Sequence, residues 1–136
     1  MVQRTIIRGL VAAVVAAALD VGVLLVARSA GASMMVPIPL VDESQGMPAG
    51  VVAVFAAGAL VGATVLALVL ADRTPSGARR VFTIVAVAGA VLSCIPIPVL
   101  APDLATTIAL VLMHLITGAV ALVALLPALR RDRLAA

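Results

Sequence analysis

Apolar side chains fill four long stretches of this sequence, and polar residues gather between them. The stretches cover residues 9–27, 50–71, 81–100 and 104–126. None alternates with a period of two, and a helix of about 20 residues is enough to cross a hydrocarbon core of ~30 Å. Because lipid cannot satisfy unpaired backbone groups, all four should be helices. The pattern predicts an all-α, four-helix transmembrane bundle, one domain over residues 1–136, with an outer loop at 28–49.

The composition agrees with a membrane protein. Of the 136 residues, 65% are apolar and 11% are charged, and a water-soluble domain of this size could not bury so much apolar surface. The first stretch could instead be a secretory signal, since Arg4 and Arg8 precede it and Ala30-Gly31-Ala32 resembles a cleavage site. It is longer than the apolar part of a signal and contains Asp20, so a retained membrane span is the preferred interpretation.

All nine basic residues are arginines, and their distribution predicts the topology. They precede the first stretch, separate the second from the third and follow the fourth, and only Arg28 lies on the other side. The positive-inside rule therefore predicts a multi-pass protein of the plasma membrane with both termini cytoplasmic. The expected partners are the lipid bilayer and its anionic headgroups. Nucleic acid is not expected, because Phe55 and Phe82 are the only aromatic side chains that could stack on bases.

Two ionisable residues interrupt the apolar stretches. Asp20 lies twelve residues after Arg8, or ~18 Å along a helix, and His114 lies twelve residues before Leu126 on a helix that runs the opposite way. Both should therefore be near the middle of the membrane, where charge is costly. Small and hydroxylated neighbours on the same helix faces predict that both point inward. The preferred interpretation is an Asp20–His114 hydrogen bond that sets helix register, and the alternatives are a proton relay or ion site and unrelated orientations.

Other sequence features offer little catalytic chemistry. A single cysteine, Cys94, and a single histidine leave no disulfide and no multi-histidine metal site within one chain. No phosphate-binding loop, dinucleotide fingerprint or nucleophile motif is present, so neither an enzyme nor a cofactor is expected. Gly58 and Gly62 form a GxxxG motif typical of close helix packing. Packing within the chain is preferred, and a homodimer contact is the alternative.

A Pro-Ile-Pro segment occurs twice, at Pro37–Pro39 in VPIPL and at Pro96–Pro98 in IPIPV. Proline interrupts regular structure, and both copies fall on the predicted outer side. We expect Pro37, Pro39, Pro96 and Pro98 to form an outer cap in which the loop lies against the end of the third helix. A two-plus-two repeat with a transport site at the breaks is an alternative, although the two copies are unequally spaced from their helices.

Several features together resemble a known family. They are the arginine-rich start, a polar residue in the first span, and the two runs RRVFTIVAVAGAVLSCIPIP (Arg79 to Pro98) and LMHLITGAVAL (Leu112 to Leu122). These resemble small four-helix membrane proteins of actinobacteria that are classified as a domain of unknown function, and the resemblance covers almost the whole chain. It implies no activity, cofactor or ligand. An amide is common in that family at the position of Asp20, which weakens any mechanism that needs a carboxylate.

Two functions of different classes follow from these observations. The first is a non-catalytic membrane component that binds lipids or other membrane proteins, including a second copy of itself. The alternative is a small proton- or cation-coupled transporter that uses Asp20 and His114.

Overall fold

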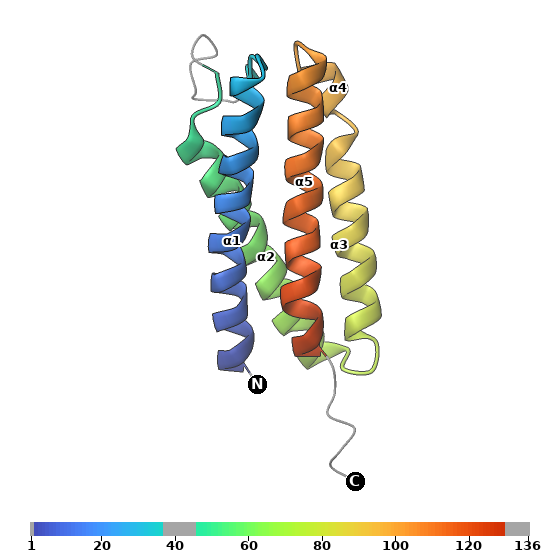
Figure 1. Cartoon of the computed structure of the whole chain (residues 1–136). Coiled ribbons are helices and arrows are strands. Elements are labelled where there is room, and N and C mark those ends of the chain that lie inside the picture. The colour runs from blue at the N-terminus through green and yellow to red at the C-terminus, as the bar shows by residue number, and fades with distance from the viewer. Residues whose placement is uncertain (1, 37–45, 130–136) are drawn as a thin grey trace.

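The computed structural model describes residues 2–36 and 46–129, and within them every regular element is a helix (Figure 1). The elements, in chain order, are α1 (Val2–Ser29), α2 (Ala49–Arg73), α3 (Ala78–Cys94), α4 (Ile97–Leu100), α5 (Leu104–Leu125) and the 3₁₀ helix η2 (Leu126–Leu129). The predicted all-α bundle is confirmed.

Four helical segments are long and apolar enough to cross a membrane. They are Val2–Ser29, Ala49–Arg73, Ala78–Leu100 and Leu104–Leu129. The third includes both α3 and α4: Pro96 stands at the N-cap of α4, and the chain stays helical at Ile95 on its way from α3 into α4. Proline therefore interrupts the hydrogen bonding of this segment without ending the span. Four such segments indicate a multi-pass membrane protein.

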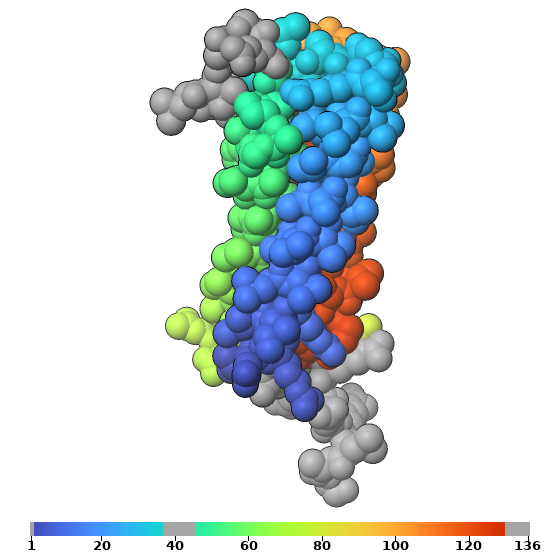
Figure 2. All heavy atoms as spheres, turned by 60° about the vertical axis from the view of Figure 1, so that its left-hand side comes forward, coloured from blue at the N-terminus to red at the C-terminus, as the bar shows by residue number. Residues whose placement is uncertain are grey.

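The helices are not packed equally. α1 lies against both α2 and α5, and α3 lies mainly against α5. Figure 2 shows α1 and α2 side by side along one face of the molecule. α2 is visibly tilted relative to the other long helices (Figure 1), and it makes much less contact with α3 than with α1. The side of the bundle between α2 and α3 is therefore the least closed.

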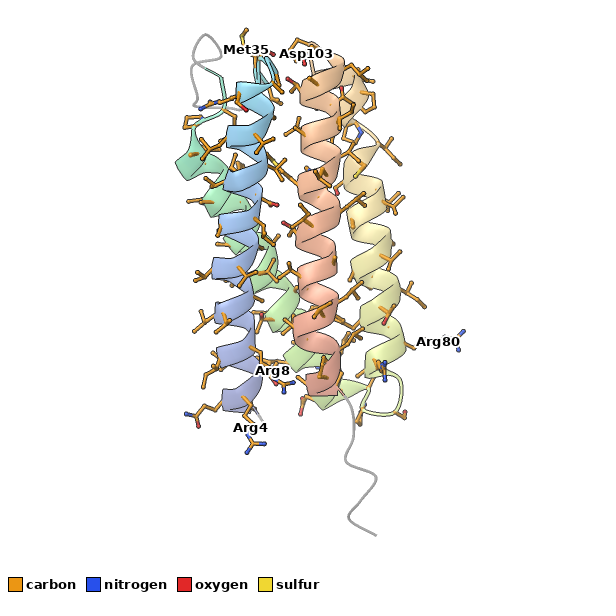
Figure 3. The ribbon with its side chains drawn as sticks, in the orientation of Figure 1. Arg4, Arg8, Met35, Arg80 and Asp103 are labelled. Atoms are coloured by element: carbon orange, nitrogen blue, oxygen red, sulfur yellow. The ribbon has the colours of Figure 1, made fainter. Side chains whose placement is uncertain are left out.

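The two ends of the bundle differ in charge. Arg4, Arg8 and Arg80 lie at one end, which we call the arginine end, and Met35 and Asp103 lie at the other, the Asp103 end (Figure 3). α1 begins and α5 ends at the arginine end (Figure 1). This arrangement agrees with the predicted grouping of arginines, while a cytoplasmic location of the arginine end stays a prediction.

Glycines bring helices together, but not those of the GxxxG motif. A Cβ on Gly9 of α1 would overlap the side chain of Thr64 of α2, and a Cβ on Gly118 of α5 would lie 2.9 Å from that of Ala90 of α3. In contrast, a Cβ on Gly58 or Gly62 would meet no atom of the described residues within 4 Å.

The predicted packing of Gly58 and Gly62 within the chain is therefore wrong. The buried residues of the middle of α2 are Ala56, Leu60 and Thr64. The glycines are two residues away from these positions, which is about 200° around a helix, and so they lie on the outward face. Their use in a contact between two copies stays a prediction.

At the Asp103 end, one backbone and one side-chain hydrogen bond connect the described ends of the outer loop. The amide of Met47 donates to the carbonyl of Met34 (2.8 Å), and the Arg28 guanidinium donates to the carbonyl of Met47 (2.7 Å). Met34 and Met47 share a core cluster with Ile97, the residue between Pro96 and Pro98. The second half of the predicted outer cap thus packs against described parts of the loop, whereas Pro37 and Pro39 lie outside the described residues.

Candidate functional site in the α2–α3 cleft

A cleft with a volume of about 560 Å³ lies between α2, α3 and α5, and Asp20 of α1 is part of its lining. Its walls are mainly alanine and other apolar side chains. Phe55 and Val85 stand on opposite walls, and they are 63% and 44% exposed. Met113 of α5 lines the cleft and is only 5% exposed. The cleft therefore reaches from the outer surface of two spanning helices to the interior of the bundle.

Asp20 is buried, with 4% of its surface exposed, and it joins α1 to α5. Its Oδ2 accepts a hydrogen bond of 2.7 Å from the hydroxyl of Thr117. The other oxygen, Oδ1, is buried and has no hydrogen-bond partner among the described residues. The small neighbours Ala13 and Ala16 on the same face of α1 are also buried, as the sequence predicted. Asp20 thus has one satisfied oxygen and one open oxygen.

His114 also lines the cleft, but it does not form the predicted hydrogen bond to Asp20. Its Nδ1 lies 2.7 Å from the carbonyl oxygen of Leu110, one turn earlier in the same helix. Since a carbonyl can only accept, Nδ1 carries a proton, and in a neutral ring Nε2 is then an acceptor. Nε2 makes no hydrogen bond within the described chain. The prediction was right that α1 and α5 are joined at Asp20 and wrong about the residue on α5, which is Thr117.

The chemistry that the cleft can offer is limited. Its polar side chains are Asp20, Ser93, His114 and Thr117, and the Ser93 hydroxyl donates to the carbonyl of Ala90 in its own helix. Within the described residues, no three His, Cys, Asp or Glu side chains come together as metal ligands would. The cleft is therefore an apolar site whose lining includes two acceptors without a partner among the described residues: Oδ1 of an ionised Asp20 and Nε2 of a neutral His114 ring.

A second polar cluster lies at the Asp103 end and was not predicted. Asp103 is the N-cap of α5: its Oδ1 accepts from the amide of Thr106 (2.7 Å), and its Oδ2 accepts from the hydroxyls of Thr106 (2.8 Å) and Ser33. The Ser33 hydrogen bond and then those of Thr106 lower the pKa of Asp103 to about 2. Thr106 Oγ1 in turn accepts from the amide of Met34 (3.0 Å).

This cluster of Ser33, Met34, Asp103 and Thr106 fastens the segment after α1 to the start of α5. An Asp directly before an apolar stretch is a typical N-cap, so the role of Asp103 at the start of α5 could have been predicted from the sequence. The hydrogen bond from Ser33 could not have been predicted from the sequence, because Ser33 and Asp103 are 70 positions apart. The cluster is structural, since its hydrogen bonds are made within the protein.

Comparisons with known proteins give a family but no function. Neither the curated proteins nor the solved structures contain a match. The actinobacterial source implied by the resemblance stays a prediction. A family model, described as a family of unknown function, matches residues 1–131, and the chain therefore belongs to the family DUF6069.

Proposed function

We propose that this chain is a non-catalytic, multi-pass protein of the plasma membrane that binds a membrane-dissolved apolar molecule in the α2–α3 cleft. The observation that carries the proposal is the cleft itself, about 560 Å³ in volume and lined almost entirely by apolar side chains. Ligand sites of small molecules are commonly apolar cavities of roughly 300–1,000 Å³ with a few polar groups.

The position of the cleft favours entry from the bilayer. Phe55, Ala59, Val85 and Gly89 are exposed lining residues, and all four belong to spanning helices. In the most apolar window of the third span only 6% of residues are buried in the protein, against 28% in each of the other three. A molecule dissolved in the lipid can therefore reach this side of the protein, or a partner membrane protein can cover it.

The arginine end supports a second kind of lipid contact. Arg79 and Arg80 are exposed at the start of α3, and together with Ser76 and Thr83 they line a shallow depression. Each such arginine near an anionic membrane surface contributes about 1 kcal/mol to binding. We therefore include anionic headgroups at this end among the proposed partners.

The test of the proposed function uses one variant that fills the cleft and one matched control. Gly89 lines the cleft and Gly62 does not, while a Cβ on either would meet no atom within 4 Å in the part of the chain that the structure describes. Gly89→Leu and Gly62→Leu should therefore both fold. Native mass spectrometry of protein purified in mild detergent should show a bound small apolar molecule in the wild type and in Gly62→Leu, but not in Gly89→Leu. Equal adducts in all three proteins would refute binding in the cleft.

A coupled transporter remains a second candidate because Asp20 and His114 line the same cleft. Against it, the other polar side chains among the described lining residues are Ser93 and Thr117 alone. A carrier normally needs several polar groups and unwound backbone near the middle of the membrane. Proteoliposomes decide between the two. A flux driven by a pH gradient that folded Asp20→Asn loses would favour the transporter, and no such flux is expected.

A further inference from the structure

We propose that the molecule bound in the cleft is a lipophilic amine, that is, an apolar body with one protonated nitrogen that donates a hydrogen bond to Oδ1 of Asp20. This inference rests on the proposed function and adds the polar chemistry of the ligand. It depends on which atoms of the cleft are still without a partner.

The open polar atoms of the cleft are acceptors. Oδ1 of Asp20 is buried, has no partner within the described residues and is an acceptor in the ionised carboxylate; Nε2 of His114 is an acceptor in the neutral ring whose proton is on Nδ1. The Thr117 hydroxyl has one proton, and it is already donated to Oδ2 of Asp20. A ligand that satisfies this site must therefore bring its own donor. A hydrocarbon chain fills the apolar part of the cleft but leaves Oδ1 unpaired.

Charge favours an amine over an alcohol. An ionised carboxyl group far from water is stabilised by an opposite charge and by hydrogen bonds, and an ammonium group supplies both. A hydroxyl group supplies a hydrogen bond without charge. No arginine is among the described residues that line the cleft, and the lining side chain with a basic nitrogen, His114, is hydrogen-bonded to Leu110 rather than to Asp20. An ammonium group on the ligand would supply the charge-assisted hydrogen bond to Oδ1 that no described side chain makes.

The remainder of the ligand must be apolar. Phe55 and Val85 on the outer walls and Met113 and Leu110 toward the interior are all lining residues without polar groups. A volume of about 560 Å³ admits a molecule with a hydrocarbon chain or ring system in addition to its amino group. The nitrogen would then lie at Asp20 and the apolar body between α2 and α3.

The test compares two photoreactive probes with the same alkyl chain. One is dodecylamine with a diazirine in the chain, and the other is the same diazirine-bearing dodecane without the amino group. Each is titrated onto the folded full-length protein in nanodiscs, illuminated, and the labelled residues are mapped by mass spectrometry. The variants are Asp20→Asn, which keeps the size of the side chain, and Gly89→Leu. The matched controls are Asp72→Asn, an exposed acid at the far end of α2, and Gly62→Leu.

We expect the amine probe to label α2 and α3 within the cleft at lower concentration than the alkane probe. Asp20→Asn should weaken labelling by the amine about tenfold or more and leave the alkane unchanged, since it removes a charge-assisted hydrogen bond. Gly89→Leu should reduce both, and the two controls should match the wild type. If Asp20→Asn does not fold, the comparison of the two probes on wild-type protein and Gly89→Leu decides.

Two results would overturn the inference, and they differ in meaning. If both probes label equally and Gly89→Leu reduces both equally, the site is apolar and Oδ1 of Asp20 is satisfied by a proton or a water molecule. That result would refute the amine as ligand and leave the proposed function in place. Labelling by both probes that Gly89→Leu does not reduce would refute the cleft as a binding site and the proposed function with it.

Discussion

The hydrogen bond between Asp20 and Thr117 predicts a specific coupling between α1 and α5. Thr117→Val keeps the shape of the side chain and removes the donor, which leaves both carboxyl oxygens of Asp20 without a partner in the described chain. Hydrogen bonds between membrane helices average about 0.6 kcal/mol and reach about 1.7 kcal/mol. We expect a loss of unfolding free energy toward the upper value, because no other partner of Asp20 remains among the described residues.

A double-mutant cycle isolates this interaction from other effects of each substitution. Unfolding in mixed micelles, followed by circular dichroism, should give a coupling free energy of about 1 kcal/mol between Asp20→Ala and Thr117→Val. The same cycle with His114→Leu should give a smaller coupling, since the His114 ring is bonded to its own helix. Thr107→Val is the matched control, because it removes only a hydrogen bond to the backbone at the start of α5. Additive losses for Asp20 and Thr117, or a larger coupling to His114, would refute this contact between α1 and α5.

Three further predictions concern packing, pH and topology. Gly9→Ala should lower the unfolding free energy by about 1–3 kcal/mol, because the added Cβ overlaps the Thr64 side chain. Gly58→Ala should not lower it. Equal effects of the two substitutions on unfolding in micelles would contradict the packing of α1 against α2. The folded pKa of Asp103 is about 2 and its ordinary value is 3.8, so its contribution to stability should be complete above about pH 5 and be lost as the pH falls toward 2. Asp103→Asn should remove that part of the pH profile in thermal unfolding, and an unchanged profile would count against the cluster. In a cysteine-free background, Met35→Cys should react with an impermeant thiol reagent on intact cells and Ser76→Cys should not, and the reverse result would invert the topology.

The four spans could be predicted from the sequence because the backbone polar groups of such apolar stretches must be hydrogen-bonded internally in lipid, and a helix does this. The sequence was also sufficient to point Asp20 inward, since small residues follow it around one helix face. It could not identify Thr117 as the partner. His114 and Thr117 are neighbours on the same face of α5, and only the rotation of α5 relative to α1 decides which of them reaches Asp20.

The cleft and the role of the glycines depend on how the helices are arranged. A small-residue motif such as Gly58 and Gly62 marks a face that can be approached closely, but the sequence does not say whether a helix of the same chain approaches it. Likewise, the cleft lies between α2 and α3, where the tilted α2 makes little contact with α3 (Figure 1). Helix tilt is set by packing against neighbours rather than by the length of a span.

The most direct test of the central claim is whether an apolar molecule of the bilayer reaches the interior of the cleft. The chain has five methionines, so a spectrum of protein with ¹³C-labelled methionine methyl groups is simple to assign. Met113 lines the cleft, whereas Met34 is fully buried in the core at the Asp103 end. The sample is perdeuterated protein in nanodiscs whose lipid chains are protonated. We predict nuclear Overhauser cross-peaks from the lipid chains to the Met113 methyl group and none to that of Met34. In Gly89→Leu the cross-peaks to Met113 should be lost. The absence of lipid cross-peaks to the Met113 methyl group in the wild type, as for Met34, would contradict the claim that apolar molecules of the bilayer reach the cleft.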